Sequence, residues 1–239
     1  SGNSILAVGS MAELAGLKGK GTRTIDAARA TVMPGFIESH LHIFMGAGEL
    51  DNLNLSDVKG FDRLQSQVRE FAAKRPDQLL VYANQVSYSV LDDHLLPTRH
   101  DLDRILPDRP FAMMTYDHHT VFANTKALER AGILNGGEVP VGSEIVMGKD
   151  GKATGELREP GAFRYILALT PTEGRDTLGF TDSAEPSPAP TPAQRTIDRD
   201  VMRRGLAYCA GFGITSIHNM DGNFYTLDLL QEIEGVKIA

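Results

Sequence analysis

Short apolar runs separated by glycine and proline open the chain. Those rich in β-branched residues predict strands at residues 5–8, 22–25 and 30–33. Residues 11–17 predict one or two helical turns. Pro34 and Gly35 then break the chain, and a further apolar stretch leads into the sequence His40-Leu41-His42.

Helical periodicity is clearest at residues 61–75, where apolar residues at spacings of three and four define one face. Further helices are predicted at residues 101–106, 125–131, 196–208 and 224–234. Strands are predicted at residues 79–83, 111–115, 143–147, 153–157, 214–220 and 236–238. Asn124 is a good N-cap for the helix over 125–131, and residues 149–151 predict a hairpin turn.

Alternate prolines mark residues 183–193, with the sequence SAEPSPAPTPA. Proline has no backbone N–H, so this segment cannot form a regular ladder of hydrogen bonds. We expect an extended, exposed loop or linker. A different interpretation is a ligand for an aromatic groove in a partner protein.

Composition places the chain among ordinary globular proteins. It has 239 residues, of which 41% are hydrophobic and 23% charged. A formal net charge of −7 argues against nucleic acid or an anionic membrane as the main partner. A single cysteine, Cys209, excludes an intrachain disulfide, and the absence of a long apolar run or basic leader favours a cytoplasmic protein.

The strongest chemical signal is the pair His40 and His42. Residues at positions i and i+2 of a strand point to the same side, so both imidazoles can reach one cation. Two histidines that share a strand face by chance are the alternative. The apolar strand and the Pro-Gly turn before it favour a metal site.

Several motifs in the same order resemble the metal-dependent amidohydrolase superfamily and its YtcJ-like branch. They are ILAVGS, TRTIDA and ATVMPGFIESHLHIF near the start, then the segment 97–133, GKATGELRE at 151–159 and GFGITSIHNM at 211–220. The resemblance implies an α/β fold, part of a (β/α)8 TIM barrel. It implies that residues 1–35 belong to a β-sandwich domain and residues 36–239 to the barrel domain. A large α+β insertion is then expected at about 50–195, after the first barrel strand.

The same resemblance implies roles for particular residues. His40 and His42 match the first metal-ligand pair, and Glu159 matches a carboxylate that serves as a further or bridging ligand. Glu159 also precedes Pro160, where a helix begins, so a helix N-terminal charge or plain solvent exposure explains it as well. His119 and Asn124 match residues that shape the substrate pocket, and N-capping is the other role for Asn124. This chain has His118 where the family usually has glycine. We expect His118 to be an exposed loop residue.

Only two barrel strands and the start of a third are expected within this sequence. The family's remaining ligands and its general-base aspartate come from later strands, so the resemblance implies a fragment with its C-terminal half missing. Two strands cannot close a barrel, and a homo-oligomer that covers the open face is the alternative.

The expected parent protein is a hydrolase that acts on carbon–nitrogen bonds of small amide-type substrates. Its cofactor is a divalent metal, with zinc as the expected ion. The alternative is a truncated, non-catalytic fragment that binds metal weakly or not at all.

Overall fold

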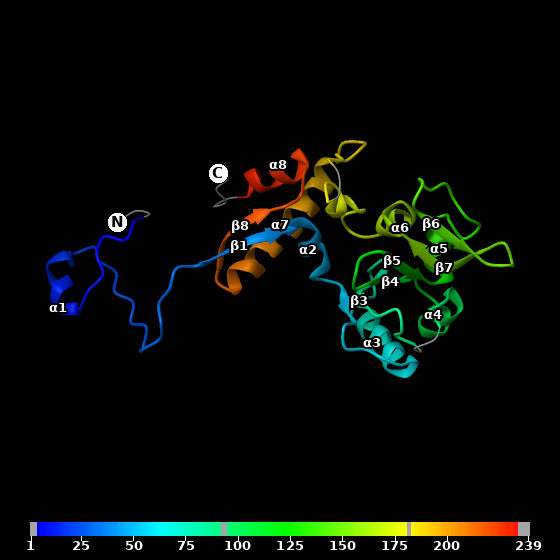
Figure 1. The fold of residues 1–239 in the computed structure, drawn as a ribbon, viewed down its shortest axis with the longest axis horizontal. Coiled ribbons are helices and arrows are strands. Elements are labelled where there is room, and N and C mark those ends of the chain that lie inside the picture. Colours follow the sequence, from blue (N-terminus) through cyan, green and yellow to red (C-terminus); the bar gives the residue numbers. More distant parts are fainter. Residues whose placement is uncertain (1–3, 92–94, 181–182, 234–239) are drawn as a thin grey trace. The chain divides into compact units, whose positions relative to one another are not determined.

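A computed structural model describes residues 4–91, 95–180 and 183–233 of the chain (Figure 1). The predicted strand at 236–238 lies outside the described residues. The chain divides into two compact units, Ser1–Gly35 and Phe36–Ala239. No helix in the described part is both long and apolar enough to cross a membrane.

The first unit contains the predicted helical turns. Helix α1 (Met11–Leu14) continues into the 3-10 helix η1 (Ala15–Leu17), and Ser10 and Glu13 form a capping box at its start. The three strands predicted in this unit were wrong, because no strand forms within residues 4–35 and none of these residues is buried. A strand needs a neighbour for its backbone groups, and this segment supplies none to itself. The β-sandwich assignment of residues 1–35 stays a prediction.

In the second unit, two strands far apart in sequence form a parallel pair. Strand β1 (Phe36–Leu41) lies beside β8 (Ile214–Asn219), with Phe36 opposite Ile214 and Leu41 opposite Asn219. An apolar cluster joins three helices to this pair: α2 (Ile43–Glu49), α7 (Pro192–Gly211) and α8 (Phe224–Glu232). The buried members of the cluster include Ile43, Phe44, Val201, Met202, Tyr225 and Leu229.

A buried ion pair ties these helices to the 3-10 helix η2 (Arg175–Thr177). Asp198 of α7 is fully buried and accepts hydrogen bonds from Nε and Nη2 of Arg175, at 2.6 and 2.9 Å. The Tyr225 hydroxyl on α8 donates to the same carboxylate at 2.5 Å. Three hydrogen bonds from these two residues compensate the burial of the Asp198 charge.

Between α2 and α7 in the sequence lies a mixed sheet of six strands in the order β2-β3-β4-β5-β7-β6. The strands are β2 (Leu53–Asn54), β3 (Val81–Val86), β4 (Phe111–Thr115), β5 (Thr120–Ala123), β6 (Glu144–Met147) and β7 (Ala153–Arg158). The first three run parallel to one another, and the pairs β4–β5, β5–β7 and β6–β7 are antiparallel. The chain therefore has the α/β architecture that the sequence predicts.

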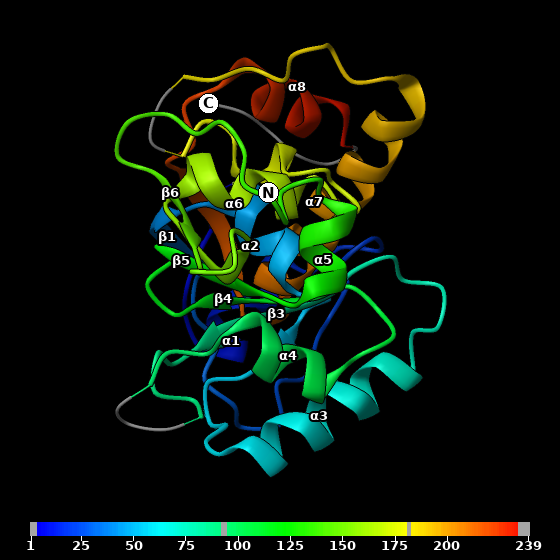
Figure 2. The ribbon, with the colours of Figure 1, turned by 90° about the vertical axis from the view of Figure 1, so that its right-hand side faces the viewer.

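Helices cover both faces of this sheet (Figure 2). Helices α3 (Phe61–Ala73) and α4 (Arg99–Ile105) pack on the face that carries Val81, Phe111 and Met113. Helices α5 (Thr125–Arg130) and α6 (Pro160–Leu167) pack on the opposite face. Successive side chains of a strand point to opposite faces, and this sheet is apolar on both.

Several predicted elements are confirmed with small shifts at their ends. The helix at 61–75 is α3, the helix after Asn124 is α5, and the hairpin around Gly151 joins β6 to β7. One boundary was wrong, because α7 begins at Pro192 and takes in the last proline of the segment expected to be extended. Thr191 and Gln194 form a capping box there, and proline at the first helical position loses no hydrogen bond.

Candidate metal centre

Strand β1 carries both predicted histidine ligands to its carboxyl end. His40 is the last residue but one of the strand, and His42 is the N-cap of α2. Their ring centroids are 5.4 Å apart, with planes inclined at 79°. Metal–nitrogen bonds of about 2.0–2.1 Å allow two imidazoles at this separation to share one ion. The structure thus brings together the pair that alternation along the strand predicted.

The neighbouring strand β8 holds this end of β1 in place. The backbone N–H of Ile43 donates to Oδ1 of Asn219 at 3.1 Å. The backbone N–H of Met220 donates to the carbonyl oxygen of Leu41 at 2.8 Å. These two bonds connect the residues on either side of His42 to the end of β8.

Asp221, just after β8, contacts His42 directly. Nδ1 of His42 lies 2.8 Å from Oδ1 of Asp221, and the two side chains are 22% and 3% exposed. A carboxylate behind an imidazole is a frequent arrangement at metal centres, since it orients the ring and leaves its other nitrogen for the ion. Oδ2 of Asp221 is buried and has no hydrogen-bond partner among the described residues. The donor set at this point therefore suits a divalent metal.

Glu159 lies in a different arrangement. Its carboxylate oxygens are 3.1 and 3.2 Å from Nδ1 of His119, and its backbone N–H donates to the carbonyl oxygen of His119 at 2.8 Å. Within the described part of the chain, no three His, Cys, Asp or Glu residues are grouped as metal ligands. The structure pairs Glu159 with His119 rather than with His40 or His42, and its role as a metal ligand stays a prediction.

The loop between β4 and β5 presents His119. Asp117 in this loop accepts hydrogen bonds from the Thr115 hydroxyl at 2.6 Å and from the backbone N–H of His119 at 3.2 Å. Burial raises the pKa of Asp117, but these hydrogen bonds outweigh it and bring the pKa below its ordinary value. Asp117 therefore acts as the anchor of the loop, and His119 remains 62% exposed on it.

His118 is not the exposed loop residue that we expected. Its side chain is 29% exposed, and its Nδ1 lies 3.5 Å from Oε1 of Glu49. Burial lowers the pKa of His118. Its φ of 61° falls in the left-handed region, where glycine is free of strain, which gives a physical reason for the family's usual glycine at this point.

Asn124 is fully buried, and all the hydrogen bonds of its side-chain amide are made with backbone groups. Its Oδ1 accepts from the backbone N–H of Phe111 and Ala127, at 3.0 and 2.8 Å. Its Nδ2 donates to the carbonyl oxygens of Leu106 and Arg109, at 2.9 and 2.8 Å. The N-cap role is confirmed. The predicted part in substrate binding stays a prediction, and the geometry restricts it to positioning the backbone.

Sequence reasoning missed Asp221 and the contact that Asn219 makes. A usable signal was present, since polar residues that follow neighbouring parallel strands meet at the same edge of a sheet. The pairing of the strand at 214–220 with the strand before His42 was the missing step.

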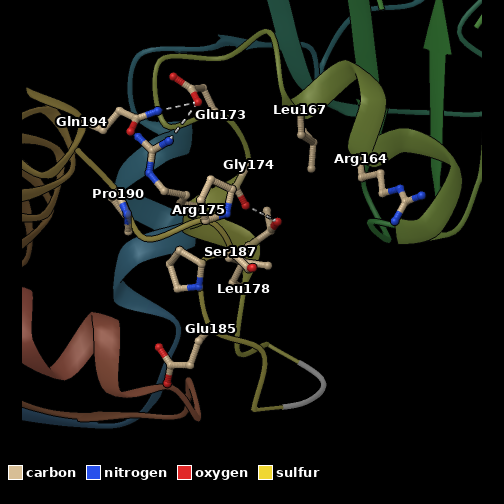
Figure 3. A pocket seen from close by; sticks show the side chains of 13 residues that line it. Arg164, Leu167, Glu173, Gly174, Arg175, Leu178, Glu185, Ser187, Pro190 and Gln194 are labelled. Carbon is tan, nitrogen blue, oxygen red and sulfur yellow. Dashed lines mark hydrogen bonds and ion pairs between the residues drawn. The ribbon is translucent and has the colours of Figure 1, made fainter.

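A pocket of about 360 Å³ lies between η2 and the proline-rich segment at residues 183–193 (Figure 3). Arg175 and Gln194 both contact Glu173 in its wall, at 3.3 and 2.8 Å. None of the residues predicted from the sequence for catalysis, metal or substrate lines this pocket.

Comparison with known proteins identifies the family. The model of the amidohydrolase family matches residues 23–237. The putative amidohydrolase YtcJ of Bacillus subtilis is 33% identical over 207 residues, which are 85% of this chain and 35% of that protein. The N-substituted formamide deformylase of Arthrobacter pascens is 30% identical over 164 residues, which are 68% of this chain and 30% of that protein. The chain thus spans about a third of the length of these relatives.

Solved structures agree at the level of the fold. An uncharacterized metal-dependent hydrolase from Pyrococcus horikoshii matches with a TM-score of 0.52 and 20% identity, over 83% of this chain and 33% of that one. A second one, from Pyrococcus furiosus, matches with a TM-score of 0.51 and 22% identity. With the family match over residues 23–237, the order of the motifs and the histidine pair at the end of β1, these findings show that the chain belongs to the amidohydrolase family.

Proposed function

We propose that the protein is a metal-dependent hydrolase that acts on carbon–nitrogen bonds of amide type. The observation that carries the proposal is the meeting of His40 and His42 at the end of β1, with Asp221 behind His42. Family membership supports the reaction class. The name of the Arthrobacter relative points to N-substituted formamides as the first substrates to try.

His40 and His42 would hold the metal, for which we propose zinc. When bound, such an ion polarises a carbonyl oxygen and lowers the pKa of a bound water. The protein's own part is to orient His42 through Asp221 and to present His119 and Glu159, which contact each other. We propose that His119 contacts the substrate, since it is exposed and anchored by Asp117.

We also propose that β1 and β8 are neighbouring strands of a (β/α)8 barrel. Their parallel pairing and the packing of α2, α7 and α8 against them support this architecture. Among the described residues each strand pairs with the other alone, so each leaves one edge open. Further barrel strands would cover these edges, and a second copy of the chain is the alternative.

The test combines metal content with amine release. Metal per chain is measured by plasma mass spectrometry on protein of verified intact mass, in the original chain, in His40→Ala/His42→Ala and in His100→Ala. His100 is a suitable control because its side chain is 68% exposed on α4. The same variants are also made in the proposed parent protein with the later strands, and they are assayed for release of amine from a panel of N-formyl and N-acetyl amines.

We expect nearly one metal per chain, retained in His100→Ala and lost in the double variant. In the parent protein, amine release should be lost with the metal in the double variant. After a chelator has removed the metal from the unsubstituted parent, adding zinc should restore amine release. A chain of correct mass that takes up no metal would contradict the site. Bound metal without amine release would favour the non-catalytic fragment instead.

A further inference from the structure

We propose that Asp221 is a positioning residue that holds the proton of His42 on Nδ1 and keeps Nε2 as the ring's available ligand atom. The significance of this tautomer rests on the proposed metal site. The tautomer itself does not, because it follows from contacts within the chain.

The chemistry of the contact between His42 and Asp221 determines which ring nitrogen carries the proton. The two atoms are 2.8 Å apart, which is a good hydrogen-bond distance. An ionised carboxylate accepts hydrogen bonds and donates none, whereas a neutral imidazole has one donor nitrogen and one acceptor nitrogen. Nδ1 of His42 must therefore donate to Asp221, and Nε2 keeps its lone pair.

The fold holds the contact between His42 and Asp221 in place. Asp221 is 3% exposed, so water competes poorly for its carboxylate. The backbone bonds from Ile43 to Asn219 and from Met220 to Leu41 join the segments that carry the two side chains. The ring of Phe180 lies against His42, with centroids 4.4 Å apart. Both the partner and the ring orientation of His42 are thus determined by the fold.

The surroundings of His40 differ from those of His42. No hydrogen bond to a ring nitrogen of His40 occurs among the described residues, and His40 is exposed. Of the two histidines, only His42 has a carboxylate that selects its tautomer. We therefore expect the effect of Asp221 to be specific to His42.

Imidazole nitrogen spectra of the metal-free chain test this directly. The chain is labelled with nitrogen-15 and studied at about pH 8, where an ordinary histidine is neutral. The signals of His42 are identified by their loss in His42→Ala. We expect the proton on Nδ1 in the original chain and in Asp221→Asn, whose amide oxygen still accepts. In Asp221→Ala we expect a shift to the Nε2–H form that free neutral histidine prefers.

Zinc affinity, measured by competition with a chelator, provides the second readout. Loss of a carboxylate behind a ligating histidine weakens metal binding by roughly 10–100-fold, so Asp221→Ala should fall in that range. Asp221→Asn should lose less, since it keeps the orientation and loses only the charge. Asp228→Ala is the control, because Asp228 lies on α8 and its side chain is 58% exposed.

The outcomes separate this inference from the proposed function. An Nε2–H form of His42 in the original chain, or an unchanged tautomer in Asp221→Ala, would overturn the inference even if the chain binds zinc. An Nδ1–H form that is lost in Asp221→Ala, in a chain that binds no zinc, would support the positioning role and remove the metal site.

Discussion

Asn124 and His42 use hydrogen bonding in opposite ways. Asn124 gives both donors and its acceptor oxygen to the backbone, and nothing remains for a ligand. His42 contacts Asp221 through Nδ1, and its Nε2 has no hydrogen-bond partner among the described residues. At the scale of single residues, this difference separates a side chain that supports the fold from one that is available for chemistry.

Asn124→Ala should therefore destabilise the fold strongly. It removes an N-cap and leaves the buried backbone groups of Leu106 and Phe111, and the part-buried carbonyl of Arg109, without that partner. We expect a loss of about 2–4 kcal/mol in the free energy of unfolding, measured by urea denaturation. Asn135→Ala, at an exposed position, should change it by less than about 0.5 kcal/mol. A loss below about 1 kcal/mol for Asn124→Ala would contradict the structural role.

At the scale of elements, β7 and the start of α4 approach closely at Gly155. A β-carbon added at Gly155 would lie 2.6 Å from the backbone nitrogen of Arg99 and 2.8 Å from the carbonyl oxygen of Ala123. The buried Arg99 side chain crosses the same contact and donates to the carbonyl oxygen of Ala153 at 3.0 Å. Helix α4 and strand β7 can therefore approach this closely only because residue 155 is glycine and has no β-carbon.

Gly155→Ala should be far more damaging than Gly151→Ala. Both glycines have positive φ, 108° and 74°, but a β-carbon at Gly151 meets nothing within 4 Å. We expect Gly151→Ala to cost about 1–2 kcal/mol through backbone strain alone. Gly155→Ala should cost about 3 kcal/mol or more, because backbone atoms must also move. Equal unfolding free energies of the two variants in urea would argue against the close contact.

Elements with a local signal could be predicted from the sequence. The apolar face of α3, the Asn124 cap of α5 and the turn at Gly151 all depend on neighbours within a few residues. Strand β5 was missed, because Thr120–Ala123 is only four residues long and gains its structure from β4 and β7. The alternation that pairs His40 with His42 is local as well, whereas the contact of His42 with Asp221 spans 179 positions and needs the fold.

At the scale of the whole molecule, two partly buried carboxyl groups lie where separate parts of the second unit meet, and the Glu49 side chain is 28% exposed. Glu49 is the last residue of α2, and burial raises its pKa from 4.5 to about 7. A hydrogen bond with Asn84 on β3 lowers this pKa, but by less than burial raises it. Asp176 lies in η2, and burial raises its pKa from 3.8 to about 6, against a hydrogen bond from Thr172. Both shifts favour the protonated form in the folded chain.

These two groups should make the chain less stable as pH rises. Their contribution to the free energy of unfolding is complete below the pKa values of the unfolded chain, 4.5 for Glu49 and 3.8 for Asp176. This contribution is lost as the pH rises through the pKa values of the folded chain, about 7 for Glu49 and about 6 for Asp176. We expect Glu49→Gln and Asp176→Asn to gain in unfolding free energy relative to the original chain across this range. Urea denaturation between about pH 4 and about pH 8 measures the difference.

The control for this prediction is Asp77→Asn, at an exposed position. The unfolding free energy of Asp77→Asn should change with pH in the same way as that of the original chain. If the unfolding free energies of Glu49→Gln and Asp176→Asn also follow that of the original chain at every pH, the pKa values of the two carboxyl groups are not raised in the folded chain.

The pairing of β1 with β8 has a consequence for synthesis of the protein in the cell. Roughly 180 residues separate Phe36 from its partner Ile214. At about 5–20 residues per second, a ribosome needs on the order of 10–40 s to deliver the second strand after the first. During this interval the nascent β1 lacks its partner β8, whereas the strands of the six-stranded sheet between them emerge together with their own partners. The end of β1 that carries His40 and His42 is therefore among the last parts of the second unit to reach its final geometry.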